Sequence, residues 1–200
     1  NTKTKMFCDC LNDPEESHPN QNVCPICLGH PGALPTINKS AVFSVLKLGL
    51  ALGAEIPQNS HFDRKSYFYP DLPKGYQISQ YEEPFVLGGE INKIRIKRVH
   101  LEEDTGRIIH GEKESLMDFN RAGRPLMELV TEPDIKNAEE AKLFAEELQL
   151  LLRYLEISHA DMEKGQMRVE ANVSVSPDKQ SLGTKVEIKN LNSLRAVVLA

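Results

Sequence analysis

Residues 99–107 of the chain read VHLEEDTGR and combine a histidine, three consecutive acids and an arginine beside an apolar stretch. Adjacent carboxylates repel one another, so this arrangement implies a positive charge nearby. Two more carboxylates stand in strand-like segments, Glu128 in PLMEL and Glu187 in KVEIKN. Carboxylates that converge from neighbouring strands suit Mg²⁺, a hard cation that prefers oxygen ligands. The sequence therefore predicts a magnesium site formed by Glu103, Glu128 and Glu187.

Basic and amide side chains accompany these acids, which suits the phosphates of a nucleotide bound through the metal. The sequence has no Walker-type glycine loop and no GxGxxG motif, so a sheet surface would have to hold the nucleotide. The residues expected to contact phosphate or substrate are Arg64, Arg121, Arg124, Arg168, Asn172, Lys185 and Lys189. Covalent catalysis is disfavoured, because no Gly-x-Ser-x-Gly elbow is present. The histidines His61, His100 and His110 lack an evident nucleophile, and we expect them to be ordinary surface or hydrogen-bonded residues.

All four cysteines fall in the first 27 residues, as the pairs Cys8-x-Cys10 and Cys24-x-x-Cys27. Two close pairs separated by a short loop can present four sulfurs to one tetrahedral centre, which is the spacing of a zinc site. Two disulfides in a secreted domain are the alternative, but the remaining chain has ample core residues and no cysteine. We expect a closed, structural Zn²⁺ site, with His18 as a weaker substitute ligand.

The composition, with 200 residues, 40% of them hydrophobic and 26% charged, fits a soluble globular protein of one large domain or one domain with an appendage. A formal charge of −5 argues against a segment devoted mainly to gripping nucleic acid, although it leaves room for a local basic patch. No apolar run approaches the ~20 residues of a membrane span, and no signal peptide is visible. The chain begins NTKTKMF and stops inside the apolar run LRAVVLA, so we expect a piece of a longer polypeptide.

Two segments must position the acids near residue 103. Apolar residues at helical spacing predict a helix from Asn38 as cap to Gly53. Residues 91–103 are expected to form a strand, in which a change of apolar parity predicts a bulge near residues 97–98. After that shift Glu103 points to the covered side, where a carboxylate needs a cation or a proton.

The second half of the chain carries a helix and a hairpin. The helix should begin at Asn137, with Glu140 completing a capping box. Alternation over residues 167–175 and 183–191 predicts an antiparallel hairpin with its turn at 176–182 and one polar face. Glu170 should then lie opposite, or diagonal to, Glu187 and Lys189. Such a polar face can also simply be wet.

Five segments closely resemble the family of B subunits of the aspartyl/glutamyl-tRNA amidotransferases: FDRKSYFYPDLPKGYQISQ, HLEEDTG, NRAGRPLMELVTEPDI, MRVEANVSV and GTKVEIKNLNS. The resemblance implies an α+β fold, an antiparallel β-sheet cradle with flanking helices that is similar to glutamine synthetase and the guanidino kinases. It also implies a zinc knuckle over residues 1–30 at the edge of a catalytic domain over residues 31–200. The tRNA-binding domains of the family are expected after residue 200, and its Gly-Leu-Glu-x-His strand, which contributes to the metal site, before residue 1.

The activity that the resemblance implies is ATP-dependent and uses Mg²⁺. The side-chain carboxylate of glutamate on tRNA(Gln), or of aspartate on tRNA(Asn), is phosphorylated, and ammonia then displaces the phosphate to give the amide. The ammonia is released from glutamine in the amidase (A) subunit, and the small C subunit completes a heterotrimer. Such a protein would be cytoplasmic, or organellar in a eukaryote, with no membrane partner.

Site residues are carried over by position. The three acids of the predicted magnesium site match acids that hold or surround Mg²⁺ in the family. Lys65 in DRK and Lys74 in PKGY match basic residues near the mouth of the ammonia channel, and Glu170 in RVEAN matches an acid on the same route. The resemblance thus implies catalytic roles for Glu103, Lys65, Lys74 and Glu170. The cysteine pairs match a zinc knuckle found in many members.

Three alternatives stay open. The first is the archaeal-type E subunit of Glu-tRNA(Gln) amidotransferase, which shares much of this region. The second is another phosphotransferase on a glutamine-synthetase-like sheet, acting on a free metabolite. The third is a zinc-knuckle binding module without catalysis, against which the long motifs outside the cysteines weigh. Copurification with an amidase-type protein would separate the amidotransferase from the second alternative.

Overall fold

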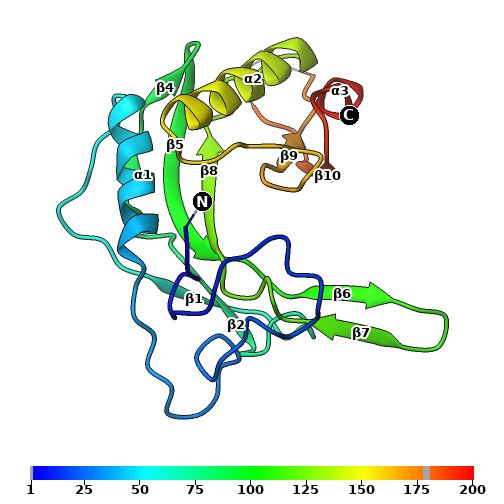
Figure 1. Cartoon of the computed structure of the whole chain (residues 1–200). Helices are drawn as coiled ribbons and strands as arrows, with labels where there is room; N and C mark the ends of the chain where they lie inside the picture. The colour runs from blue at the N-terminus through cyan, green and yellow to red at the C-terminus, as the bar shows by residue number, and fades with distance from the viewer. Residues whose placement is uncertain (1, 178–180) are drawn as a thin grey trace. The chain divides into compact units, whose positions relative to one another are not determined.

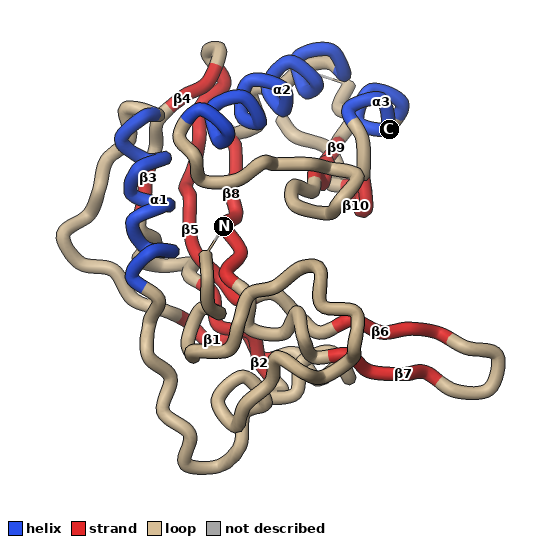
Figure 2. Tube along the Cα trace, in the orientation of Figure 1, coloured by secondary structure: helices blue, strands red, loops and turns tan. Residues whose placement is uncertain are grey.

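The computed structural model describes residues 2–177 and 181–200. The helices and strands of these residues are α1 (Lys39–Ala51), β1 (Asp63–Ser66), β2 (Tyr76–Ser79), β3 (Val86–Leu87), β4 (Glu90–Ile91), β5 (Ile94–Glu103), β6 (Arg107–His110), β7 (Ser115–Asp118), β8 (Pro125–Thr131), α2 (Ala138–Tyr154), β9 (Val169–Val173), β10 (Val186–Leu191) and α3 (Leu194–Leu199) (Figures 1 and 2). Short antiparallel sheets with few helices confirm the predicted mixed α+β character.

The chain divides into two compact units, unit 1 (Asn1–Gly89 and Ile96–Val130) and unit 2 (Glu90–Arg95 and Thr131–Ala200). This division does not follow the predicted boundary at residue 30. The N-terminal segment is bonded into unit 1, because Met6 N–H donates to Gly123 O at 2.8 Å and Asn22 N–H donates to Asn120 Oδ1 at 2.8 Å. Residues 1–30 therefore belong to the same compact unit as the strands that carry the site.

The longest strand, β5, pairs antiparallel with β3 and β4, and β8 also pairs with it. The pairing with β3 and β4 keeps one register on both sides of residues 97–98, so the predicted bulge is absent from this edge of β5. The irregularity falls on the partner instead, where Gly88 and Gly89 take φ values of 72° and 92° between β3 and β4. Glycine adopts this left-handed region without the clash that a Cβ would cause, so the break costs little.

Burial along β5 explains why the parity of its apolar residues changes. Up to Lys97 buried and exposed residues alternate, whereas every residue from Val99 to Glu103 is buried. A strand with consecutive buried residues is covered on both faces. Glu103 is buried as expected, at 2% exposed, but Glu102 on the opposite face is also only 7% exposed.

Helix α1 forms as predicted and is tied to the N-terminal segment through its cap. Asn38 Oδ1 accepts a hydrogen bond from Ser40 N–H at 2.9 Å, and Asn38 Nδ2 donates to the backbone oxygens of Thr4 and Lys5, each at 3.1 Å. The helix lies against β3. One side chain therefore begins the helix and anchors the chain that leads to the first cysteine pair.

Unit 2 contains the predicted second helix and hairpin. Asn137 Oδ1 accepts from Glu140 N–H at 2.9 Å and caps α2, which packs with α3. Strands β9 and β10 pair antiparallel, as expected, with Asn172 opposite Glu187. The predicted turn at 176–182 includes residues 178–180, which lie outside the described residues. None of the helices in the described ranges is long and apolar enough to cross a membrane.

Replacing Asn38 by Ala should lower the free energy of unfolding by about 1–2 kcal/mol, because the helix loses its cap and two backbone oxygens lose a donor. Urea denaturation followed by circular dichroism measures the loss. Asn38→Asp is the matched control, since it keeps the acceptor for the helix N–H groups but not the two donated bonds, and should lose less. An Ala variant as stable as the wild type would show that this cap contributes nothing.

Candidate functional site

The acid-rich end of β5 carries two sites, because successive strand residues point to opposite faces. On one face lies a group that we call the histidine–glutamate cluster, formed by His100, Glu102 and Glu128. On the other lies the lysine–glutamate pair, formed by Lys74 and Glu103. All five residues belong to unit 1. The neighbouring acids Glu102 and Glu103 therefore lie in different environments.

In the histidine–glutamate cluster, His100 Nε2 lies 3.7 Å from Glu128 Oε2 and 3.9 Å from Glu102 Oε2. Ser79 Oγ donates to Glu102 Oε2 at 3.0 Å, and the buried His100 Nδ1 has no hydrogen-bond partner within the described ranges. Burial and the charge of Glu128 raise the pKa of Glu102 to about 7, and burial lowers the pKa of His100 to about 4. A neutral imidazole beside two carboxyl groups is a donor set that fits a divalent cation.

Strand β1 brings two of the predicted basic residues to this region. Lys65 is exposed, and its positive charge lowers the pKa of both His100 and Glu102. This charge adds to the effect of burial at His100 and opposes the effect of burial at Glu102. The Arg64 guanidinium lies 4.9 Å from the centre of the Tyr76 ring. Lys65 is therefore within electrostatic reach of the cluster, and the substrate role of Arg64 stays a prediction.

The cation that the buried Glu103 carboxylate requires is Lys74. The Lys74 ammonium donates to both carboxylate oxygens of Glu103, and the two side chains are only 9% and 3% exposed. Ile78 N–H donates to Glu103 Oε1 at 2.9 Å, and Gln77 Nε2 donates to the backbone oxygen of Glu103 at 2.8 Å. The predicted role of Glu103 as a metal ligand stays a prediction, and its carboxylate is engaged by an ammonium and a backbone amide.

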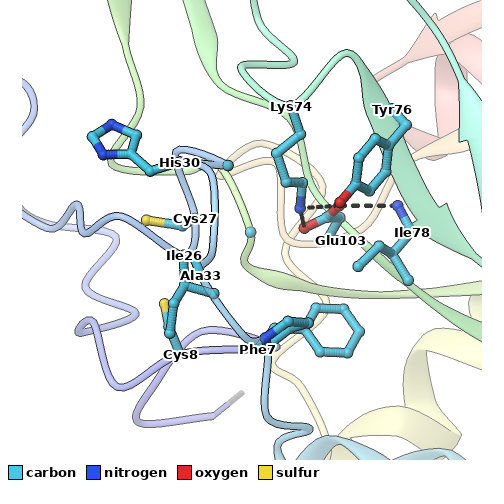
Figure 3. A pocket seen from close by; sticks show the side chains of 13 residues that line it. Phe7, Cys8, Ile26, Cys27, His30, Ala33, Lys74, Tyr76, Ile78 and Glu103 are labelled. Atoms are coloured by element: carbon cyan, nitrogen blue, oxygen red, sulfur yellow. Dashed lines mark hydrogen bonds and ion pairs between the residues drawn. The ribbon is translucent and has the colours of Figure 1, made fainter.

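The lysine–glutamate pair lines a cavity of about 70 Å³. Figure 3 shows Cys8, Cys27 and His30 on one side of this space and Lys74 and Glu103 on the other. The cavity is lined by apolar as well as polar groups, and one of that size has room for a few molecules as small as water or ammonia. The cysteine-bearing segment and the buried ion pair therefore share one cavity.

The predicted gathering of the cysteines is confirmed. The sulfurs of Cys8, Cys10, Cys24 and Cys27, which we call the cysteine cluster, all lie within 4.8 Å of one another and are free thiols. His18 is not in the cluster, and its ring nitrogen lies 3.2 Å from a Glu16 oxygen instead.

The electrostatics within the cysteine cluster favour negative charge at Cys27, whereas burial raises the pKa of Cys10 to about 11 and the hydrogen bond with Cys27 raises the pKa of Cys8. A hydrogen bond with Cys8, aided by the charge of Lys5, lowers the pKa of Cys27 to about 4. Lys5 is fully buried, with Nζ 3.6 Å from Cys27 Sγ and 3.2 Å from Phe119 O. Four thiolates around Zn²⁺ carry a net negative charge that a buried ammonium can offset, so these residues fit a zinc ion.

The two arginines predicted to bind phosphate in the turn before β8 contact the chain's own backbone. Arg121 donates to Gly106 O at 2.6 Å, and the guanidinium of the half-buried Arg124 donates to the carbonyl oxygen of Asp13. They hold neighbouring loops in place in this structure. Their phosphate role stays a prediction.

The remaining predicted site residues lie in unit 2 on or beside the β9–β10 hairpin: Arg168, Glu170, Asn172, Lys185, Glu187 and Lys189. Glu170 lies on the same polar row as Asn172, diagonal to Glu187, and Lys189 Nζ lies 3.3 Å from Glu187 Oε2. The hairpin therefore places Glu170, Asn172 and Glu187 on one face, and its register shifts between Ile188 and Leu191. That Glu187 joins acids of unit 1 around a metal stays a prediction.

Two residues of the histidine–glutamate cluster, His100 and Glu102, were not among the predicted ligands. The available signal was their spacing, since residues two apart in an apolar strand share a face. The expectation of ordinary histidines is confirmed for His61, which is bonded to Glu83 at 3.1 Å, and for His110, which is bonded to a serine hydroxyl at 3.1 Å. His100 differs because its side chain is buried and its Nδ1 has no hydrogen-bond partner in the described part of the chain, whereas His61 is exposed and both of its ring nitrogens have acid partners.

Comparison with known proteins gives one consistent result. The family model described as the GatB/GatE catalytic domain matches residues 1–200. The B subunit of the aspartyl/glutamyl-tRNA(Asn/Gln) amidotransferase of Thermus thermophilus is 56% identical over 200 residues, which cover 98% of this chain and 43% of the relative. The corresponding protein of Thermomicrobium roseum is 53% identical over 209 residues (98% and 43%), and that of Dehalococcoides mccartyi is 50% identical over 214 residues (100% and 44%). The chain spans less than half the length of these curated relatives.

In metal-free protein, Glu102→Gln should raise the free energy of unfolding at pH 8 and have little effect at pH 5. The pKa of Glu102 is raised from 4.5 to about 7 in the folded state, so the wild type loses stability as pH rises through this window, whereas a neutral Gln does not. The difference at pH 8 should be on the order of 3 kcal/mol. Urea denaturation with a chelator present measures it, with exposed Glu112→Gln as control. An increase in the free energy of unfolding that is equal at pH 5 and pH 8 would contradict the raised pKa of Glu102.

Cys24→Ser should lower both the zinc content and the thermal stability of the protein, because three sulfurs and a hydroxyl make a poorer zinc site than four sulfurs. Elemental analysis and calorimetry measure the two effects. His18→Ala should leave the zinc content unchanged, since His18 lies outside the cysteine cluster. A wild type that is purified without zinc and is equally stable would refute the structural role.

Proposed function

Because the chain belongs to the GatB/GatE catalytic domain family, we propose that it is the catalytic domain of the B subunit of an aspartyl/glutamyl-tRNA(Asn/Gln) amidotransferase. The observation that carries the proposal is the 50–56% identity to such B subunits over 98% or more of the chain. The names of those relatives support this reading over the archaeal-type E subunit. The substrates would be glutamate on tRNA(Gln), aspartate on tRNA(Asn), or both.

The proposed reaction has two steps. A carboxylate is a poor acyl donor, so the γ-phosphoryl group of ATP is first transferred to a carboxylate oxygen of the substrate side chain, releasing ADP. Ammonia then attacks the carbonyl carbon, inorganic phosphate leaves, and a proton is lost from nitrogen as the amide forms. The acyl phosphate is hydrolysed where water reaches it, so the site must be sheltered.

The histidine–glutamate cluster is the proposed magnesium site, and the predicted metal-binding role of Glu187 in β10 is kept as a separate proposal. The support for the cluster is the close approach of His100, Glu102 and Glu128, together with the raised pKa of Glu102, which marks a buried carboxyl in need of a cation. When bound, Mg²⁺ offsets the repulsion between the substrate carboxylate and the triphosphate. Glu103 takes a different role in this proposal, because Lys74 already engages its carboxylate.

The lysine–glutamate pair is proposed to line the route of ammonia. The cavity beside it is small and has the Glu103 carboxylate among its lining groups, which can accept an N–H from ammonia and take up the proton released on C–N bond formation. Lys74 would hold that carboxylate in place. Roles on the same route are proposed for Lys65 and Glu170 on the resemblance to the family alone.

The other parts of the proposal follow the family. The fold would be the antiparallel cradle of glutamine synthetase and the guanidino kinases, with a structural zinc in the cysteine cluster. Phosphate or substrate contacts are proposed for Arg64, Arg121, Arg124, Arg168, Asn172, Lys185 and Lys189. An amidase subunit would supply ammonia and a small third subunit would complete a heterotrimer. Cytoplasmic translation would be its setting.

In the full-length protein assembled with its partner subunits, Glu128→Gln should lower kcat for amide formation by about 100-fold or more, because a metal ligand is lost. Glu187→Ala should do the same. Amide formation is measured with each mischarged tRNA and added ammonium chloride, which makes the assay independent of glutamine hydrolysis. Glutaminase activity of the partner should be unchanged, and exposed Glu112→Gln should match the wild type. A Glu128→Gln enzyme with the wild-type rate would remove the metal assignment.

A further inference from the structure

We propose that the cysteine cluster positions the lysine–glutamate pair. The segment Cys24–His30, which we call the knuckle loop, holds Lys74 against Glu103 when a metal closes the cluster, and metal loss releases Lys74. The consequence for amide formation rests on the function proposed above, whereas the effect on Lys74 itself does not. Lys74 would then be held by a structural site that shares no ligand with the magnesium site.

The knuckle loop is closed by its own hydrogen bonds, so we expect its residues to shift together. Leu28 N–H donates to Cys24 O at 3.0 Å, Gly29 N–H donates to Ile26 O at 3.0 Å, and Cys24 N–H donates to Cys27 Sγ at 3.2 Å. Two of the four sulfurs therefore lie in the same tight turn as Gly29. A shift of either sulfur displaces the glycine that follows.

Gly29 is the point at which this loop meets Lys74. A Cβ built on Gly29 would lie 2.2 Å from Lys74 Cγ and 3.0 Å from Lys74 Cα, closer than carbon atoms approach without displacement. The glycine backbone thus lies directly against the aliphatic stem of Lys74. The Lys74 side chain is thus confined by the Gly29 backbone along its aliphatic part and by Glu103 at its ammonium group.

A second contact connects the cluster to Glu103. A Cβ built on Gly123 would lie 3.4 Å from Cys27 Cβ and 4.0 Å from Glu103 Oε2, and Gly123 O accepts from Met6 N–H at 2.8 Å. Gly123 therefore fills the space between a cluster cysteine and the carboxylate. Both members of the ion pair are packed against residues that the cysteine cluster fixes.

Displacement of Gly29 and Gly123 should weaken the ion pair between Lys74 and Glu103 in two ways. Water that enters the shared cavity raises the local dielectric constant and reduces the attraction between Lys74 and Glu103. The stem of Lys74, no longer confined by Gly29, regains rotamers that point its ammonium away from the carboxylate. A displaced Lys74 leaves Glu103 misplaced for a step that depends on its position.

The direct test measures how fast an amine-reactive acylating reagent modifies Lys74 in the full-length complex, by peptide mass spectrometry. Lys113, at the exposed tip of the β6–β7 hairpin, is the internal reference. Chelation of zinc should increase the labelling of Lys74 relative to Lys113 roughly tenfold, because a buried paired amine becomes accessible. Restoring zinc should reverse the increase. Equal labelling of Lys74 with and without zinc would overturn the proposal.

A matched pair of variants tests the contact without removing the metal. Gly29 and Gly32 both have positive φ, 69° and 83°, but a Cβ on Gly32 meets nothing within 4 Å. Ala at either position therefore imposes similar backbone strain, and only Gly29→Ala should disturb Lys74.

We expect Gly29→Ala to keep its zinc, to show the faster labelling of Lys74, and to lower kcat for amide formation roughly 10- to 100-fold with KM for ATP unchanged. Gly32→Ala should match the wild type in all these measurements. A Gly29→Ala complex with wild-type labelling and rate, or two variants with equal losses, would refute the positioning role. A wild-type complex that forms no amide would refute the proposed function instead, while the labelling comparison would still decide this inference.

Discussion

The burial of both faces of β5 over its last five residues is the constraint on which the site depends. Water reaches neither side of the strand at Glu102 and Glu103, and an ionised carboxylate without a partner in such a place costs several kcal/mol. Because the two residues point in opposite directions, no single partner can serve both. Each acid needs its own environment, and two distinct sites arise from one strand end.

Glu102 and Glu103 have different partners for their buried carboxyl groups, and we infer different roles from this difference. Glu103 receives the Lys74 ammonium and the Ile78 N–H, so its charge is compensated by the protein itself. Glu102 receives one hydroxyl from Ser79 and faces a second acid, which with burial raises its pKa to about 7. Near neutrality it is open to exchange of a proton for an external cation. We therefore infer that Glu103, whose charge is neutralised by Lys74, has a fixed position, and that Glu102, which lacks such a partner, is the better candidate for binding a ligand.

Local signals predict the elements well, and tertiary cover explains what they miss. The caps Asn38 and Asn137 mark both long helices, because an N-cap is a contact between residues near in sequence. The apolar residues of β5 change parity along the strand, and in the sequence this change resembles a bulge. Its cause is that both faces of the strand are buried from Val99 to Glu103, which the sequence alone does not reveal. For the same reason the only sequence signal that sets His100 apart from an ordinary histidine is its spacing of two residues from Glu102. The partner of Glu103 lies 29 residues away, at Lys74, and only the resemblance to a family draws attention to it.

Buried charge also favours one of the two readings of the cysteines that the sequence leaves open. Disulfides would make the cluster neutral and leave the Lys5 ammonium, which is fully buried, with the Phe119 carbonyl and uncharged sulfur as partners. An uncompensated buried ammonium is as costly as a buried carboxylate. Four thiolates around a zinc ion instead carry the negative charge that this lysine requires. The free thiols and their mutual approach agree with that arrangement, so Lys5, which spacing arguments ignore, is the residue that favours metal over disulfide.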